Sequence, residues 1–153
     1  MRRAAAVFFL DASCIIAAVC AWHVHHLRAA AEIEARLDAR ERMATAGHAL
    51  AESYAVLTRL PPPHRLSPAD ALALLEANFL EIAQAVALDA EGYKALLRRA
   101  GSEGVSGGRT YDAVIGDCAV KAGAAVLLTF NAHHFEGLDA AGVRVVVPAE
   151  ARG

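Results

Sequence analysis

Two polar residues in the sequence follow apolar runs of the kind that form buried strands, and both could take part in chemistry. Asp11 comes directly after the run 4–10, and Asn131 follows the run 124–130. In open α/β sheets, ligands bind at the carboxyl ends of the strands. Because the two strands lie far apart in the sequence, this shared placement indicates a common site. For Asp11 alone, a helix N-cap for the segment SCIIAAV is an equally simple interpretation, and capping is compatible with metal binding.

Glu52 is a second candidate acid, on a helix predicted over 47–60. Its neighbours three and four residues away on that helix are His48, Ala49, Ala55 and Val56. The glutamate is therefore expected on a largely apolar face, where a charge costs free energy unless a partner neutralises it. That partner is either a metal ion or an arginine such as Arg59, which would make Glu52 part of a salt bridge.

Asp112 opens a predicted helix directly after a glycine-rich segment, in the fragment GGRTYDAVIGDCA. The helix dipole also favours an acid in the first turn, so a purely structural role stays open. Asp117 lies five residues later, and five positions turn an α-helix by roughly 140°, so the two carboxylates are not expected to project together. Asp117 can instead pair with Lys121 one turn further on.

Three carboxylates and the amide of Asn131, if brought together, form an all-oxygen pocket. Such a pocket suits Mg²⁺, or Mn²⁺ in its place, because these hard ions prefer carboxylate, carbonyl and water ligands. One ion could generate hydroxide from water, and a second could bracket the attacking and leaving oxygens of a phosphodiester. Residue types and spacing therefore predict an acidic metal site at the end of a parallel sheet.

The elements that must position these residues alternate between strands and helices. Apolar runs predict strands at 4–10, 43–45, 81–88, 124–130 and 143–147, the last at a sheet edge. Periodicity and capping residues predict helices at 13–19, 25–40, 47–60, 67–79, 89–100 and 112–122. The segment 101–108 holds four glycines and two serines, which predicts the most flexible part of the chain. The alternation predicts an α/β fold, a three-layer α/β/α sandwich with a mainly parallel sheet, as one domain over 1–153.

Composition limits the partners and the compartment. Hydrophobic residues make up 56% of the chain, and the formal net charge of −2 excludes a strongly basic surface, so RNA contacts must come from local arginines or metal ions. Three cysteines without a C-x-x-C pair indicate a reducing cytoplasm. Asp11 interrupts the first apolar run, which argues against a targeting segment. No apolar stretch approaches the roughly 20 residues that span a bilayer, so a soluble cytoplasmic protein with no membrane partner is expected.

The order of these fragments resembles PIN-domain proteins, specifically the VapC-type toxins of bacterial toxin–antitoxin pairs. FFLDAS resembles the opening strand of that family with its first acid, and HALAESYAVLTRLP resembles its second motif. GGRTYDAVIGDCAVKAGAAVLLTFNAHHF resembles its third and fourth motifs. Each motif is short, but four in this order form a specific pattern that spans Phe8 to about Phe135.

The resemblance implies magnesium-dependent endonucleolytic cleavage of RNA. Asp11, Glu52 and Asp112 would be the catalytic acids that hold the metal, and Asn131 would take a fourth position where many relatives carry aspartate. This departure leaves the number of ions open, and Asp117 is a candidate for the missing charge. The family also implies a homodimer, and inhibition by a small cognate antitoxin whose tail blocks the acidic groove.

The same resemblance implies further polar groups around the acids. Ser13 and Thr129 would support them. Arg109, beside the glycines and three residues before Asp112, is the preferred phosphate contact, and such a contact positions an RNA backbone without reading its sequence. The other basic candidates are mostly expected to be solvated surface: Arg59, Arg65, Arg98, Arg99 and Lys121. No motif encodes which RNA is cleaved.

Several other interpretations remain open from the sequence. A PIN-like domain that has lost activity and binds a partner is the main alternative, which Asn131 favours and the intact set of three acids opposes. GSEGVSGG lacks the glycine patterns of nucleotide-binding loops and follows a helix. FFLDASC lacks the second aspartate that phosphatase-like nucleophiles use. The histidines of WHVHH and the pair His133–His134 could bind zinc or nickel, but the spacing is poor, and His133 or His134 is instead expected at the edge of the cleft.

Overall fold

The computed structural model describes residues 4–150. Within this range the strands are β1 (Val7–Leu10), β2 (Arg42–Ala46), β3 (Gln84–Val86), β4 (Val126–Leu128) and β5 (Arg144–Val146). The α-helices are α1 (Ala12–Val19), α2 (His26–Asp38), α3 (Gly47–Arg59), α4 (Pro68–Leu75), α5 (Ala90–Glu103) and α6 (Arg109–Lys121). Three short helical turns are η1 (Glu76–Leu80), η2 (Ala132–Phe135) and η3 (Leu138–Ala141). No helix in the described range is both long and apolar enough to cross a membrane.

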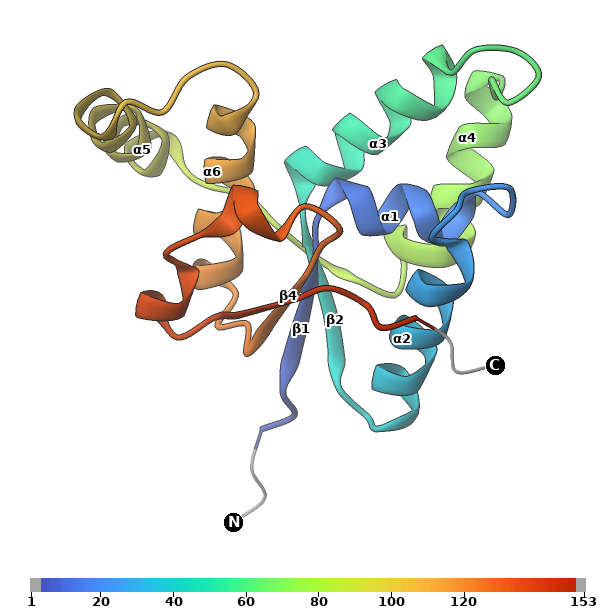
Figure 1. Cartoon of the computed structure of the whole chain (residues 1–153), viewed down its shortest axis with the longest axis horizontal. Coiled ribbons are helices and arrows are strands. Elements are labelled where there is room, and N and C mark those ends of the chain that lie inside the picture. The colour runs from blue at the N-terminus through green and yellow to red at the C-terminus, as the bar shows by residue number, and fades with distance from the viewer. Residues whose placement is uncertain (1–3, 151–153) are drawn as a thin grey trace.

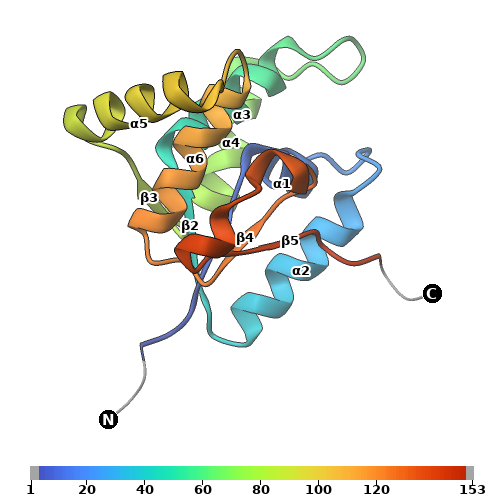
Figure 2. The same ribbon diagram turned by 60° about the vertical axis from the view of Figure 1, so that its left-hand side comes forward.

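The strands form one parallel sheet in the order β3-β2-β1-β4-β5. Helices α1 to α4 lie on one side of it, and α5, α6 and the turns η2 and η3 lie on the other (Figure 1). The view turned by 60° shows the same separation, with α2 and α6 on different sides of the strands (Figure 2). The predicted three-layer α/β/α sandwich with a parallel sheet is therefore confirmed.

The strand order reverses between β1 and β4. From β1 the chain moves outward to β2 and β3, and it then returns across the sheet to place β4 on the other side of β1. Leu10 pairs with Leu128 at the carboxyl end of these two central strands. The segments that leave β1 and β4 diverge at this point, which opens the position where parallel α/β sheets bind their ligands.

The core of the sheet is built on β1. Phe8, Phe9 and Leu10 have no exposed surface, because neighbouring strands flank β1 and helices cover both of its faces. The predicted strand 4–10 is too long, since residues 4–6 are exposed and only the last four residues pair. The fifth strand lies at a sheet edge, as predicted, and β3 forms the other edge.

The predicted N-caps are confirmed, but three helix boundaries differ from the prediction by more than two residues. Regular α4 ends at Leu75, and the chain continues as the π-helical turn η1. Helix α5 continues to Glu103 and stops where Gly104 takes a φ of 73°, so the first part of the predicted flexible segment 101–108 is helical. Helix α6 begins at Arg109, because Gly108 is already close to helical backbone geometry, and this places Asp112 within its first turn.

Replacing Phe9 with alanine tests the central position of β1. We expect the free energy of unfolding to fall by about 3–5 kcal/mol, because the cavity lies in a fully buried part of the core. Urea denaturation followed by circular dichroism measures the change. Leu97→Ala on α5 is the control, since this side chain is 59% exposed and should cost no more than about 0.5 kcal/mol. An equal fall in the free energy of unfolding of both variants would contradict the central position of β1 in the core.

Candidate active site

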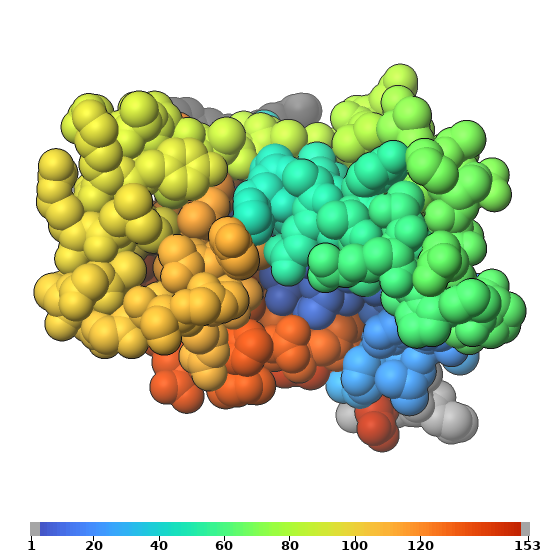
Figure 3. Space-filling model, turned by 90° about the horizontal axis from the view of Figure 1, so that it is seen from above, coloured from blue at the N-terminus to red at the C-terminus, as the bar shows by residue number. Residues whose placement is uncertain are grey.

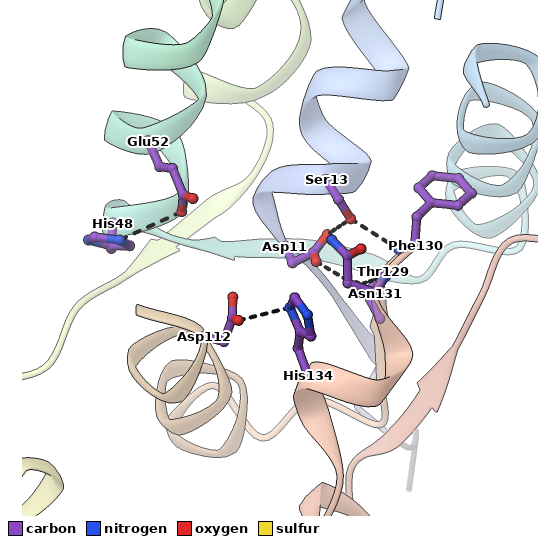
Figure 4. Close-up of polar contacts among 9 residues, drawn as sticks. All are labelled: Asp11, Ser13, His48, Glu52, Asp112, Thr129, Phe130, Asn131 and His134. Atoms are coloured by element: carbon purple, nitrogen blue, oxygen red, sulfur yellow. Dashed lines mark hydrogen bonds and ion pairs between the residues drawn. The ribbon is translucent and has the colours of Figure 1, made fainter. Parts of the chain in front are cut away.

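The carboxylate of Asp11 is buried at the carboxyl end of β1, with 4% of the residue exposed. Its Oδ1 accepts hydrogen bonds from the Ser13 hydroxyl at 2.7 Å and from the Cys14 backbone N–H at 3.0 Å. Its Oδ2 accepts one from the Thr129 hydroxyl at 2.5 Å (Figure 4). The bond from Cys14 also caps α1, so the capping role and the site role fall on the same side chain.

The residues after β4 make hydrogen bonds that fix the orientation of the Asp11 carboxylate. The Thr129 hydroxyl that donates to Asp11 accepts from the Asn131 backbone N–H at 2.9 Å. The Ser13 hydroxyl accepts from the Phe130 backbone N–H at 3.0 Å. Ser13 and Thr129 therefore both contact the acid, and Figure 4 shows the Asn131 amide beside the same carboxylate.

Burial raises the pKa of Asp11 above its ordinary value. The hydrogen bonds from Thr129, Ser13 and Cys14 oppose this shift because they stabilise the charged form. The negative charge of Asp112 also raises the pKa of Asp11, so the two acids interact electrostatically. A cation between them would relieve both the burial cost and the repulsion.

Asp112 reaches the site from the first turn of α6. Its Oδ2 lies 3.0 Å from Nδ1 of His134, which stands on η2 (Figure 4). Burial raises the pKa of Asp112, and the nearby His134 and Arg109 act in the opposite direction. His134, one of the two histidines expected at the edge of the site, therefore contacts an acid, and Arg109 is close enough for its charge to lower the pKa of Asp112.

Glu52 reaches the site from α3. Its side chain is 39% exposed, and Ala55, its neighbour on the helix, is exposed too, so the expected cost of burying this charge does not arise. The basic group beside it is His48, whose Nε2 lies 3.6 Å from Oε2, and the suggested partner Arg59 is not in contact. Figure 4 shows the carboxylates of Glu52, Asp112 and Asp11 turned toward a common space.

Asp117 is engaged elsewhere. Both of its carboxylate oxygens accept from Arg99 on α5 at 2.8 Å. The predicted pair with Lys121 is wrong, because Lys121 instead donates to the Ala87 carbonyl at 2.8 Å. Only the tertiary packing of α5 on α6 brings Arg99 to this position, so the sequence spacing could not indicate it.

Two features of the site lie outside the sequence prediction. The His48 ring stacks on Tyr111 with centroids 5.0 Å apart, beside Glu52 and Asp112 respectively. Nε2 of His48 is buried, and among residues 4–150 it has no hydrogen-bond partner. The four-residue spacing from His48 to Glu52 was a signal that could have indicated their contact. The stack on Tyr111 depends on packing of α3 against α6 and left no such signal.

The open side of the site is a hollow in the molecular surface. From above, the start of α1 lies at the base of this hollow, with α3 on one side and the segment after β4 on the other (Figure 3). A cleft of about 790 Å³ adjoins it on the other side of α6, and its lining includes Arg109, Asp112 and His134. Of the three acids, Asp112 is the one that lines this cleft.

The oxygen ligands of the site suit a divalent cation that keeps several of its waters, because they do not enclose an ion on all sides. Among residues 4–150, no three His, Cys, Asp or Glu side chains are gathered closely enough to enclose an ion. Mg²⁺ does not need such a cage, because it keeps several waters and is held in proteins by one or two carboxylates. Two interacting carboxylates with raised pKa values, Asp11 and Asp112, provide that arrangement.

Comparison with known proteins finds relatives across most of the chain. The family model for the PIN domain matches residues 8–140. Ribonuclease VapC40 of Mycobacterium tuberculosis is 39% identical over 122 residues, which are 76% of this chain and 81% of that protein.

Solved structures share the fold at lower identity. The crystal structure of Mycobacterium tuberculosis VapC20, described as a sarcin–ricin loop cleaving toxin, has a TM-score of 0.63 at 20% identity and covers 88% of this chain and 95% of its own. VapBC2 from Rickettsia felis, bound to a promoter DNA fragment, has a TM-score of 0.65 at 17% identity, with 92% and 98% covered. At these identities the likeness shows the fold alone.

The raised pKa of Asp11 predicts how stability depends on pH in the absence of metal. Between the ordinary and the raised pKa the folded state holds a proton that the unfolded chain releases, so this group lowers the free energy of unfolding as pH rises above about 4. We therefore expect Asp11→Asn in EDTA to be more stable than wild type at neutral pH, by a margin that shrinks toward pH about 4.

Urea denaturation at a series of pH values measures this margin. Asp139→Asn is the control, because Asp139 is exposed on η3 and should show no comparable pH-dependent gain. An Asp11→Asn protein that is less stable than wild type at neutral pH would contradict the account of Asp11 as a carboxylate penalised by burial.

Proposed function

The chain belongs to the PIN-domain family and to its VapC group, and from this premise we propose that it is a divalent-metal-dependent endoribonuclease, the toxin of a toxin–antitoxin pair. The observation that carries the proposal is the convergence of Asp11, Glu52 and Asp112 from three separate elements on one space. The burial of two of these acids costs stability, because it raises the pKa of Asp11 and of Asp112 and so disfavours their charged forms.

Asp11, Glu52 and Asp112 would hold the metal, with the Asn131 amide beside them. Mg²⁺, or Mn²⁺ in its place, would activate water and stabilise the charge that develops on a phosphodiester. The protein fixes its own groups around that chemistry. Three hydrogen bonds orient Asp11, and His134 holds Asp112 through Nδ1. Asn131 contributes an oxygen without charge, so the proposal is not tied to a second ion.

RNA is proposed as the substrate because the related protein VapC40 is named a ribonuclease. Arg109 supports this choice, since it begins α6 within electrostatic reach of Asp112 and lines the adjoining cleft. An arginine there would hold a backbone phosphate near the acids and would position the strand without reading its sequence.

A small antitoxin is proposed as the protein partner. Support comes from the structural likeness to VapBC2 and from the family resemblance, which implies a partner whose tail blocks the acidic groove. Homodimerisation and a soluble, cytoplasmic existence are proposed on the family resemblance. The competing function is a partner-binding module without activity, which the replacement of an acid by Asn131 favours.

Cleavage of RNA by the purified protein tests the proposal. After removal of any co-purifying partner, the protein is incubated with total cellular RNA in Mg²⁺, Mn²⁺ or EDTA. We expect discrete cleavage that requires the metal and that falls more than about 100-fold in Asp11→Asn and Asp112→Asn, since even indirect metal contacts are worth 10- to 100-fold. Asp139→Asn is the matched control and should cleave like wild type.

Two results would count against the nuclease. Equal cleavage by wild type and Asp11→Asn would point to a contaminating enzyme. A folded protein that neither cleaves RNA nor binds Mg²⁺ by calorimetry would favour the inactive binding module.

The ion pair of Asp117 with Arg99 predicts that Asp117 is dispensable for cleavage. In Asp117→Asn we expect the rate of metal-dependent cleavage to stay within a few-fold of wild type. The free energy of unfolding should fall by no more than about 1 kcal/mol, because both partners of this ion pair are partly exposed. Single-turnover cleavage and urea denaturation measure the two quantities. A loss of activity as large as that of Asp112→Asn would instead place Asp117 among the metal-binding acids.

A further inference from the structure

An exposed aromatic stack lies beyond the acidic site, where the segments 20–28 and 59–65 meet. The indole of Trp22 stacks on the ring of His64, with centroids 4.1 Å apart and an angle of 22° between the planes. Trp22 is nevertheless 48% exposed. A large flat ring is thus supported by His64 while much of it faces solvent, although apolar surface of this kind is normally buried. We call this pair the Trp22 stack.

A chain of ring contacts joins the Trp22 stack to the acids. Trp22 lies 5.8 Å from His23, His23 lies 5.6 Å from His25, and His25 stacks on Phe130 at 4.4 Å with planes 10° apart. The Phe130 N–H in turn donates to Ser13, which holds the buried carboxylate. In the space-filling view the two segments lie beside the hollow that contains the start of α1 (Figure 3). The stack therefore belongs to the same face as the site.

The charge around the Trp22 stack is opposite to that of the whole chain. Segments 20–28 and 59–65 contain three arginines and four of the seven histidines and no acid, whereas the chain has a net charge of −2. Arg28 donates to the Pro148 carbonyl and Arg65 to the Leu60 carbonyl, so both meet neutral groups that leave their charge uncompensated. Among residues 4–150, no ion pair involves these arginines or Arg59.

The histidines of this patch act as flat rings more than as metal ligands. Nδ1 of His23 accepts from the His25 backbone N–H at 3.0 Å, and Nδ1 of His26 is hydrogen-bonded to the Ala17 carbonyl at 2.9 Å. Within the described residues they form no group of three that could hold an ion. A supported aromatic surface with local positive charge is the combination by which proteins bind single-stranded nucleic acid.

We propose that the Trp22 stack binds an unpaired base of the RNA strand whose phosphodiester lies at the acids. The inference rests on the proposed ribonuclease function and adds to it a subsite and a substrate class. The base stacks on the free part of the indole, and Arg28 and Arg65 attract the neighbouring phosphates. A base inside a duplex is already stacked on both faces, so the subsite selects single-stranded stretches.

The fluorescence of Trp22 tests the subsite directly, because it is the sole tryptophan of the chain. Wild-type protein in EDTA is titrated with a short oligouridylate and, separately, with the same strand annealed to oligoadenylate. We expect the single strand to quench the emission and the duplex to leave it nearly unchanged at the same concentration. An oligouridylate with abasic positions controls for contacts made by the backbone alone.

Variants extend the test to binding and turnover. Trp22→Ala should weaken binding of labelled oligouridylate by roughly 5- to 150-fold, the range found when a base-stacking aromatic is removed. Trp22→Phe should restore most of the affinity. In Mg²⁺, Trp22→Ala should raise KM for a single-stranded substrate with little change in kcat. Tyr93→Ala is the control, since Tyr93 is 41% exposed on α5 and should bind RNA like wild type. Circular dichroism checks the fold of each variant.

The outcomes separate this inference from the function on which it rests. Unchanged RNA affinity in Trp22→Ala would overturn the subsite, including the case in which Trp22 serves a protein partner instead. Equal quenching by single strand and duplex would overturn it too. RNA binding in EDTA that depends on Trp22, without any metal-dependent cleavage, would support the subsite and contradict the ribonuclease function. Metal-dependent cleavage that is the same in wild type and Trp22→Ala would support the ribonuclease function and contradict the subsite.

Discussion

The arrangement of the whole site depends on one buried carboxylate. Asp11 is held by three hydrogen bonds at the point where the strand order reverses, and its donors come from both sides of that reversal. The same side chain caps α1, so the direction of the first helix and the geometry of the site are set together. Burial disfavours the charge that a metal site requires, whereas the capping hydrogen bond from Cys14 favours it.

Much of the fold could be predicted from local sequence. The apolar runs around Phe9 and Leu127 are short and end in polar residues, which is typical of buried parallel strands. Caps such as Ser67 and Asp89 contact the backbone within three residues, so sequence alone indicates them. Boundaries were less predictable, because Gly104 and Gly108 differ in backbone conformation although the residue type is the same.

The sequence indicated which acids lie near one another, but not most of the residues that contact them. Asp11 and Asn131 follow predicted strands, and sheet topology then places them together. The contacts of Asp112 with His134 and of Asp117 with Arg99 join residues that approach only when η2 and α5 pack on α6. The exposed position of Glu52 also follows from tertiary structure, since α3 turns this face toward an open hollow and not toward the core.

The hydrogen bond between Thr129 and Asp11 spans 118 residues, which is most of the polypeptide. All three acids precede β4, so a chain interrupted before that strand would contain every proposed carboxylate but no donor for Oδ2 of Asp11. Contacts of such sequence separation close a long loop and form only when distant segments meet. During synthesis from the N-terminus, the ordered acid site therefore forms only after β1 to β4 have been made.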